Sequence, residues 1–174
     1  MKKMQTLLAA ACAATLVFAA GSALAASATA TGTATLTTTI ASYAALTIDT
    51  PTLTFADSFA ALPAPQLTTY TAKIRQTSAG GATLSVVGAD LAGTGANTIP
   101  VTGIQLTPTI TTGTGATNST ITLNTSSKTA VTYANSGVYT GTLTFDLTPL
   151  GITAYQALPV DTYTGIQNFT LSVP

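Results

Sequence analysis

The chain has 174 residues, of which 46% are hydrophobic and only 6% are charged. It contains neither His nor Glu, so it lacks the side chains on which most general acid–base and metal chemistry depends. Its formal net charge is zero, so the chain lacks the excess of basic residues that is typical of nucleic-acid-binding proteins. Forty residues are Thr, and Thr together with Val, Ile, Leu and Tyr favours pleated sheets.

The N-terminus has the pattern of a secretory signal peptide. The pair Lys2-Lys3 gives a positive start, residues 7–20 form an apolar run, and Ala23-Leu24-Ala25 is a small-x-small cleavage site. The apolar run is shorter than the roughly 20 residues that cross a bilayer, which disfavours a retained anchor. We therefore expect residues 1–25 to be a cleaved signal peptide and the mature protein, from Ala26, to be exported through the inner membrane.

The mature chain is expected to be weakly charged and free of disulfides. Its only cysteine, Cys12, lies inside the signal peptide, so stability must come from burial and sheet pairing. Without Lys2-Lys3, three basic residues remain against five Asp, which gives a mature net charge of −2. The roughly 149 residues that remain are enough for one sandwich of ordinary size.

The first mature segment alternates strictly. Every odd position from 29 to 39 is Thr, and the even positions are Ala30, Gly32, Ala34, Leu36, Thr38 and Ile40. A period of two gives a strand with one hydroxyl face and one apolar face. Such a strand can be the first strand of its own sheet, or it can complete the open sheet of another subunit by β-augmentation. The pattern alone favours the first alternative by about two to one, because any edge strand can alternate.

The rest of the chain predicts short strands between turns rich in Gly, Pro and Asn. We expect strands at 44–55, 67–77, 82–88, 98–110, 118–124, 128–134, 138–148 and 160–173. Strands of this number and spacing predict an all-β fold, an immunoglobulin-like antiparallel β-sandwich over residues 41–174. No amphipathic helix is expected, because no long apolar period of 3.6 residues occurs.

Two predicted strands share a short string, and one segment stands apart. Residues 138–148 place Tyr, Leu and Phe on one face and Thr on the other, which predicts one buried and one wet face. The string Tyr-Thr-Gly occurs there at 139–141 and again at 163–165, and we interpret the two copies as similar strands on opposed sheets.

The segment 57–66 contains two Pro residues and is expected to be a loop or a crossover between sheets.

Both ends of the mature chain resemble those of bacterial pilin subunits. The stretch 35–43, followed by Leu53-Thr54-Phe55, resembles the start of spore coat protein U-like subunits and of archaic or alternative chaperone–usher subunits. The stretch 158–165, followed by 169–174, resembles their closing strand. Spore coat U-like subunits usually carry a Cys near the position of Tyr43, which this chain lacks.

This resemblance implies an incomplete sandwich that a strand donated by another copy completes. Residues 26–40 would be the N-terminal extension that carries the donor strand, and the side chains at the subunit interface would be Ala30, Gly32, Ala34, Leu36 and Ile40. Head-to-tail donation produces an open filament. The implied function is a structural subunit of an extracellular fimbria, homopolymeric and Gram-negative, that supports adhesion or biofilm formation. A periplasmic chaperone and an outer-membrane usher are the implied partners.

The residues that carry chemistry elsewhere are expected to be structural here. We expect no enzyme activity, no metal, no cofactor and no small-molecule substrate, because the five Asp are isolated and no calcium loop, serine triad or phosphate loop occurs. Lys73 and Arg75 share one strand face and are expected to protect a sheet edge. The alternative function is a secreted surface module that binds carbohydrate or cell wall. The absence of Trp favours the fibre.

Overall fold

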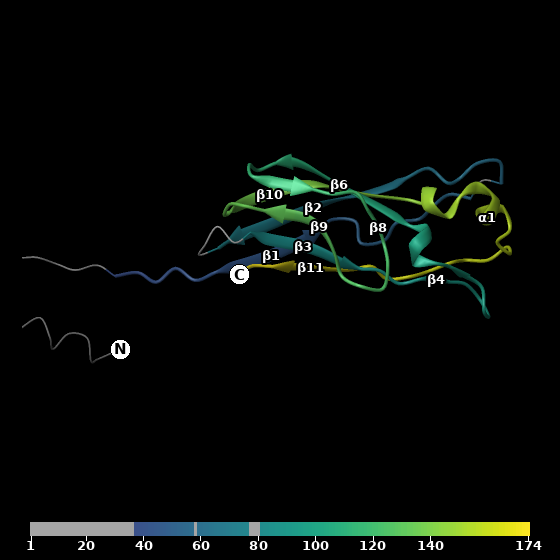
Figure 1. Ribbon diagram of the computed structural model, residues 1–174, viewed down its shortest axis with the longest axis horizontal. Coiled ribbons are helices and arrows are strands. Elements are labelled where there is room, and N and C mark those ends of the chain that lie inside the picture. Colours follow the sequence, from purple (N-terminus) through teal and green to yellow (C-terminus); the bar gives the residue numbers. More distant parts are fainter. Residues whose placement is uncertain (1–36, 58, 77–80) are drawn as a thin grey trace, which may run out of the picture. The chain divides into compact units, whose positions relative to one another are not determined.

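The computed structural model describes residues 37–57, 59–76 and 81–174, and a compact unit spans Thr39–Pro174. This unit consists of antiparallel strands arranged in one five-stranded sheet, one four-stranded sheet and one two-stranded sheet (Figure 1). The expected all-β antiparallel sandwich is therefore confirmed.

Two main sheets form the layers of the sandwich. The five-stranded sheet runs in the order β1 (Tyr43–Ile48), β2 (Gln66–Arg75), β10 (Gly137–Asp146), β6 (Gln105–Thr112), β8 (Ile121–Thr122). The four-stranded sheet runs in the order β11 (Asn168–Ser172), β3 (Ala82–Val87), β9 (Lys128–Tyr133), β7 (Ala116–Asn118). The small sheet pairs β4 (Leu91–Ala92) with β5 (Thr98–Ile99). Three short helical elements are η1 (Val101–Gly103), η2 (Thr148–Leu150) and α1 (Ile152–Gln156).

The sandwich has two distinct ends. At the hairpin end, β2 finishes and β1 and β10 begin, since Tyr43 pairs with Arg75 and Gly137 pairs with Ile74. At the helical end, β10 finishes and the short helices and β4 lie (Figure 1). The register therefore places the start of β1 at the hairpin end.

Inward side chains of both sheets form one core. Three tyrosines lie in it: the rings of Tyr133 and Tyr139 are 4.7 Å apart, and the hydroxyl of Tyr133 donates to that of Tyr70 at 3.4 Å. The ring of Phe145 meets Phe169 of the other sheet edge-on, with the ring centroids 6.3 Å apart. In the described part of the chain no buried polar side-chain atom lacks a hydrogen-bond partner. The expected alternation of strand 138–148 is thus confirmed, with its Tyr, Leu and Phe side chains buried.

The outer face of the five-stranded sheet explains much of the Thr content. The hydroxyls of Thr109 and Thr142 lie 2.5 Å apart, and those of Thr112 and Thr140 lie 2.7 Å apart, each pair bridging β6 and β10. Cross-strand Thr pairs stabilise sheets while keeping a polar face towards solvent. This face therefore obtains its polarity from hydroxyls instead of charges.

Several predicted strands differ from the observed ones. The expected strand 44–55 ends at Ile48, and 98–110 is interrupted by η1. The expected strand 118–124 is divided, because the chain crosses from β7 in one sheet to β8 in the other. The expected loop at 57–66 contains no strand before Gln66 among its described residues, as predicted. The short helix α1 was not expected.

The prediction for the last strand is wrong over residues 160–167. Only Asn168–Ser172 forms β11, and the second Tyr-Thr-Gly string lies outside the strands, held by a single bridge between Thr164 and Ala92. The two Tyr-Thr-Gly strings do share a Gly that lies close to the backbone of another segment. A Cβ on Gly141 would collide with the carbonyl oxygen of Thr109, and one on Gly165 would lie 2.6 Å from the carbonyl oxygen of Asp90. Each Gly therefore permits a close backbone approach.

Gly141→Ala is expected to destabilise the domain by about 1–3 kcal/mol, because the added methyl group must displace the backbone of β6. Gly137→Ala is the matched control on the same strand, since its Cβ would meet the ring of Tyr139 at an ordinary distance of 3.5 Å. Urea unfolding of both variants measures the difference. Equal losses of free energy would contradict the close approach.

The core tyrosines are expected to make the fold sensitive to alkali. Burial raises the pKa of both Tyr70 and Tyr133 above the ordinary value of 10.0. The unfolded chain therefore loses these protons first, and their contribution to stability is complete below about pH 10 and is lost as pH rises above it. Urea unfolding between pH 8 and 11 should show this decline. The free energy of unfolding should fall less steeply with pH in Tyr133→Phe than in the wild type. Tyr43→Phe alters an exposed ring and should leave this pH dependence unchanged.

Candidate functional site

The candidate site consists of the free edges of β1 and β11. Within the described residues, β1 is hydrogen-bonded to β2 alone and β11 to β3 alone, so each strand ends its sheet. The two strands lie close to each other on the same side of the sandwich (Figure 1). We call this pair of strands the β1/β11 seam. Two sheet edges with unpaired main-chain groups therefore meet at one place.

Apolar side chains at the seam are only partly covered. Leu46 and Ile48 point inward from β1, because they pair with the buried Ala72 and Tyr70, yet both are half-buried. Phe169 and Leu171 of β11 pair in the same way with two fully buried residues of β3, and they too are half-buried.

The next inward position of β1 is more open still. Ala44 is exposed although its partner across the strands, Ile74, is buried. The core is therefore complete one strand in from the seam and incomplete at the seam itself.

The seam also lacks the features that normally protect sheet edges. Natural edges are kept from pairing by very short strands, charged residues or Pro. The opposite side of the sandwich follows this rule, since it ends in β7 with three residues and β8 with two. In contrast, β1 has six residues and β11 has five, and neither contains a charged residue or a Pro. The seam is therefore competent to pair with a further strand.

The edge of β11 is held in place before any such pairing. The side chain of Gln167 bridges to the backbone of Ala89 in both directions, accepting from its N–H and donating to its carbonyl at 3.1 Å each. The preceding segment is tied to β4, because Ala92 and Thr164 exchange backbone hydrogen bonds of 2.7 and 2.9 Å. The strand thus enters the sheet at a fixed position.

Asp161 fixes the same segment to the β4–β5 turn. One of its carboxylate oxygens accepts from the backbone N–H of Thr94 at 2.5 Å and from the Thr94 hydroxyl at 2.6 Å. The hydrogen bond from the Thr94 side chain is the main cause that holds the pKa of Asp161 below its ordinary value of 3.8, assisted by backbone N–H groups. Partial desolvation raises the pKa of Tyr163 above its ordinary value, and the nearby Asp161 charge raises it further.

Most of the predicted donor residues lie outside the described part of the chain. This applies to Ala30, Gly32, Ala34 and Leu36. Ile40 is described: its side chain is 64% exposed, and residues 37–42 form no strand. The residues of the β1/β11 seam were not identified from the sequence. The available signal was that uncharged stretches, 43–48 and 168–172, lie close to the two predicted strands' outer ends.

The Asp side chains are engaged in local hydrogen bonds. Each Asp accepts hydrogen bonds that fix local structure, for instance Asp90 from the N–H of Val101 at 2.7 Å and Asp146 from the N–H of Thr148 at 2.8 Å. Among the described residues no three His, Cys, Asp or Glu side chains gather into a possible metal site. No helix in the described ranges is long and apolar enough to cross a membrane.

The expectation for Lys73 and Arg75 is wrong. They were expected to protect a sheet edge, but β2 lies between β1 and β10 and has no free edge. Both side chains instead face solvent on the outer face of the sheet.

Comparisons with protein-family models, with curated proteins and with solved structures found no match to this chain.

Asp161→Asn is expected to loosen residues 157–167 without unfolding the sandwich, because the charged acceptor of two hydrogen bonds is lost. Amide hydrogen exchange of Thr94 and Thr164 should accelerate, whereas Asp49→Asn, on another loop, should leave both unchanged. In the wild type the lowered pKa predicts that this contribution is present above about pH 3.8 and is lost as pH falls further. Unchanged exchange in Asp161→Asn would refute the assignment.

Proposed function

We propose that the protein is a structural subunit of an extracellular fimbria-like fibre, in which the N-terminal segment of one copy pairs with the β1/β11 seam of the next. The observation that carries this proposal is the seam itself: two long, uncharged, unpaired edges beside half-buried apolar side chains. A strand added there gains main-chain hydrogen bonds and covers apolar surface in one step.

The N-terminal segment has the length and chemistry that the seam requires. Residues 28–40 would span about 40 Å when extended, whereas the six residues of β1 span about 20 Å. The segment carries no charge, and its apolar face consists mainly of small side chains. Small side chains suit a strand that must enter between two sheets already in place, and Gly32 permits the closest approach.

A free seam in an unassembled subunit is a site for unwanted aggregation. The proposal therefore includes a periplasmic chaperone that covers the seam before assembly and an usher at which the exchange occurs. Because the donor segment and the seam belong to different copies, their pairing extends without closure, and an adhesive or biofilm-forming filament is the expected product.

The alternative of a carbohydrate-binding module has less support. Such modules present aromatic side chains together on a face or a group of loops. Of the described aromatic residues, Tyr70, Tyr133 and Tyr139 are buried in the core. The two most exposed, Tyr43 and Phe59, lie at opposite ends of the sandwich.

Adjacent substitutions in the N-terminal segment test the proposal. Leu36→Lys places a charge on the face expected to enter the seam, and it should abolish filaments while leaving the subunit folded. Thr35→Lys adds the same charge to the opposite face and should leave filaments intact. Electron microscopy of secreted material and thermal unfolding of the subunits provide the two readouts. Filaments from Leu36→Lys at the wild-type level would reject strand donation through this face.

A further inference from the structure

The two ends of the sandwich carry opposite charges. Lys73 and Arg75 lie at the hairpin end of β2, where the described chain has no acidic residue. Four of the five Asp lie at the helical end, where they contact α1, the β4–β5 turn, η1 and η2: Asp57, Asp161, Asp90 and Asp146. Lys128, at the start of β9, is the one basic residue towards that end. The charges are therefore separated along the strands.

The hairpin end also contains a hollow. It has a volume of about 450 Å³ and is lined by the two cationic residues together with Tyr43, Ile74, Ser136, Gly137 and Val138. Tyr43 and Val138 are 53% and 56% exposed, respectively. An apolar surface flanked by two cations is thus open to solvent at the end of the sandwich where β1 begins.

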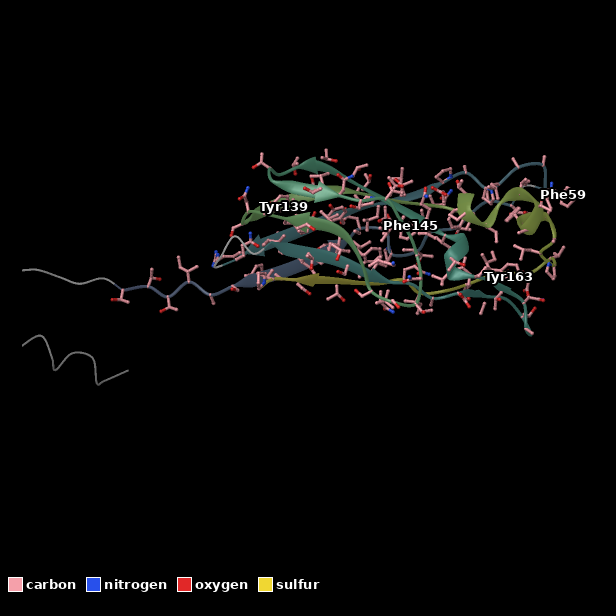
Figure 2. All side chains as sticks on the ribbon, in the orientation of Figure 1. Phe59, Tyr139, Phe145 and Tyr163 are labelled. Atoms are coloured by element: carbon pink, nitrogen blue, oxygen red, sulfur yellow. The ribbon has the colours of Figure 1, made fainter. Side chains whose placement is uncertain are left out.

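The helical end presents an exposed aromatic ring. Phe59 is 76% exposed and projects beside α1 (Figure 2). Its loop is anchored to this helix, because the carbonyl oxygen of Phe59 accepts from the side chain of Gln156 at 2.7 Å. Asp57, two residues earlier, accepts from the hydroxyl of Tyr155 at 2.7 Å. An aromatic residue and a carboxylate are therefore each tied to α1 by a hydrogen bond.

We propose that these two ends form a second interface between copies of this chain, in which Phe59 of one copy occupies the hollow at the hairpin end of the next. The ring packs against Tyr43 and Val138 and lies between two cations, an arrangement that favours cation–π contacts. Asp57 of the first copy then faces Lys73 and Arg75 of the next copy. A buried aromatic anchor surrounded by complementary charge is a common centre of protein interfaces.

This interface also sets the direction of the donated strand, and in this respect it rests on the proposed function. The N-terminal segment is joined through the chain to the start of β1, which lies at the hairpin end of its own domain. If it pairs antiparallel to β11, as neighbouring strands in immunoglobulin-like sandwiches do, its C-terminal part lies at the helical end of the acceptor.

The hairpin end of the donor then meets the helical end of the acceptor, so that cations face carboxylates. A parallel insertion would place the hairpin end of one copy against the hairpin end of the other and would bring Lys73 and Arg75 towards their own counterparts. Charge therefore favours the antiparallel insertion.

Engineered cysteines test the contact in the full mature chain, which is expected to contain no other thiol. Phe59→Cys combined with Val138→Cys should give a ladder of disulfide-linked oligomers on mild oxidation. The control pair Phe59→Cys with Val87→Cys should give no ladder beyond dimers, since both positions belong to the helical end. Filaments that form without cross-links would overturn the end-to-end contact and leave strand donation standing. Monomers with neither filaments nor cross-links would overturn both the end-to-end contact and strand donation.

Charge reversal provides a second test that introduces no cysteine. Lys73→Glu should slow filament growth in low salt about tenfold or more, because electrostatic steering is lost. Lys128→Glu makes the same change in charge at the helical end, where it adds to the negative charge that faces the cations, and should not slow growth. Equal growth rates of the two variants, measured by light scattering, would contradict the interface.

Discussion

Unpaired main-chain groups at the edges of β1 and β11 are the constraint on which the rest of the molecule depends. An open sheet edge beside apolar side chains is stable in water only if another chain covers it or if its own residues protect it. On the far side of the sandwich the protein protects its edges by keeping β7 and β8 very short. At the seam the strands are long and uncharged. This difference between the two sides is what the proposed strand donation requires.

The unusual composition follows from the same constraint. A subunit that pairs through main-chain hydrogen bonds needs strands without charge, and its outer surface must remain soluble by other means. Thr satisfies both requirements, because its branched side chain suits a pleated sheet and its hydroxyl can be satisfied by a neighbouring Thr, as in the pairs joining β6 and β10. The few charges are then available for the ends of the sandwich, where they can determine how copies meet.

Sequence periodicity predicted the interior of the sandwich well and its periphery poorly. Strands β3 and β10 lie where alternation placed them, because buried and less buried residues alternate along each. The split between β7 and β8 could not be predicted, since a period of two does not reveal that the chain changes sheets. The segment before β11 was misassigned because Gly165 packs against the backbone of Asp90, a contact between distant residues. A candidate donor face could be predicted from the sequence, whereas the proposed acceptor edge depends on strand order, which only the structure provides.

The most direct test of strand donation is solid-state NMR on filaments grown from a mixture of two batches of protein, one labelled with ¹³C and the other with ¹⁵N. Contacts between the two labels arise only between different copies. The account predicts such contacts between residues 30–36 and β11, at Phe169 and Leu171. If the N-terminal segment contacts β11 in uniformly labelled filaments but never across the two labels, the strand belongs to its own domain and donation is refuted.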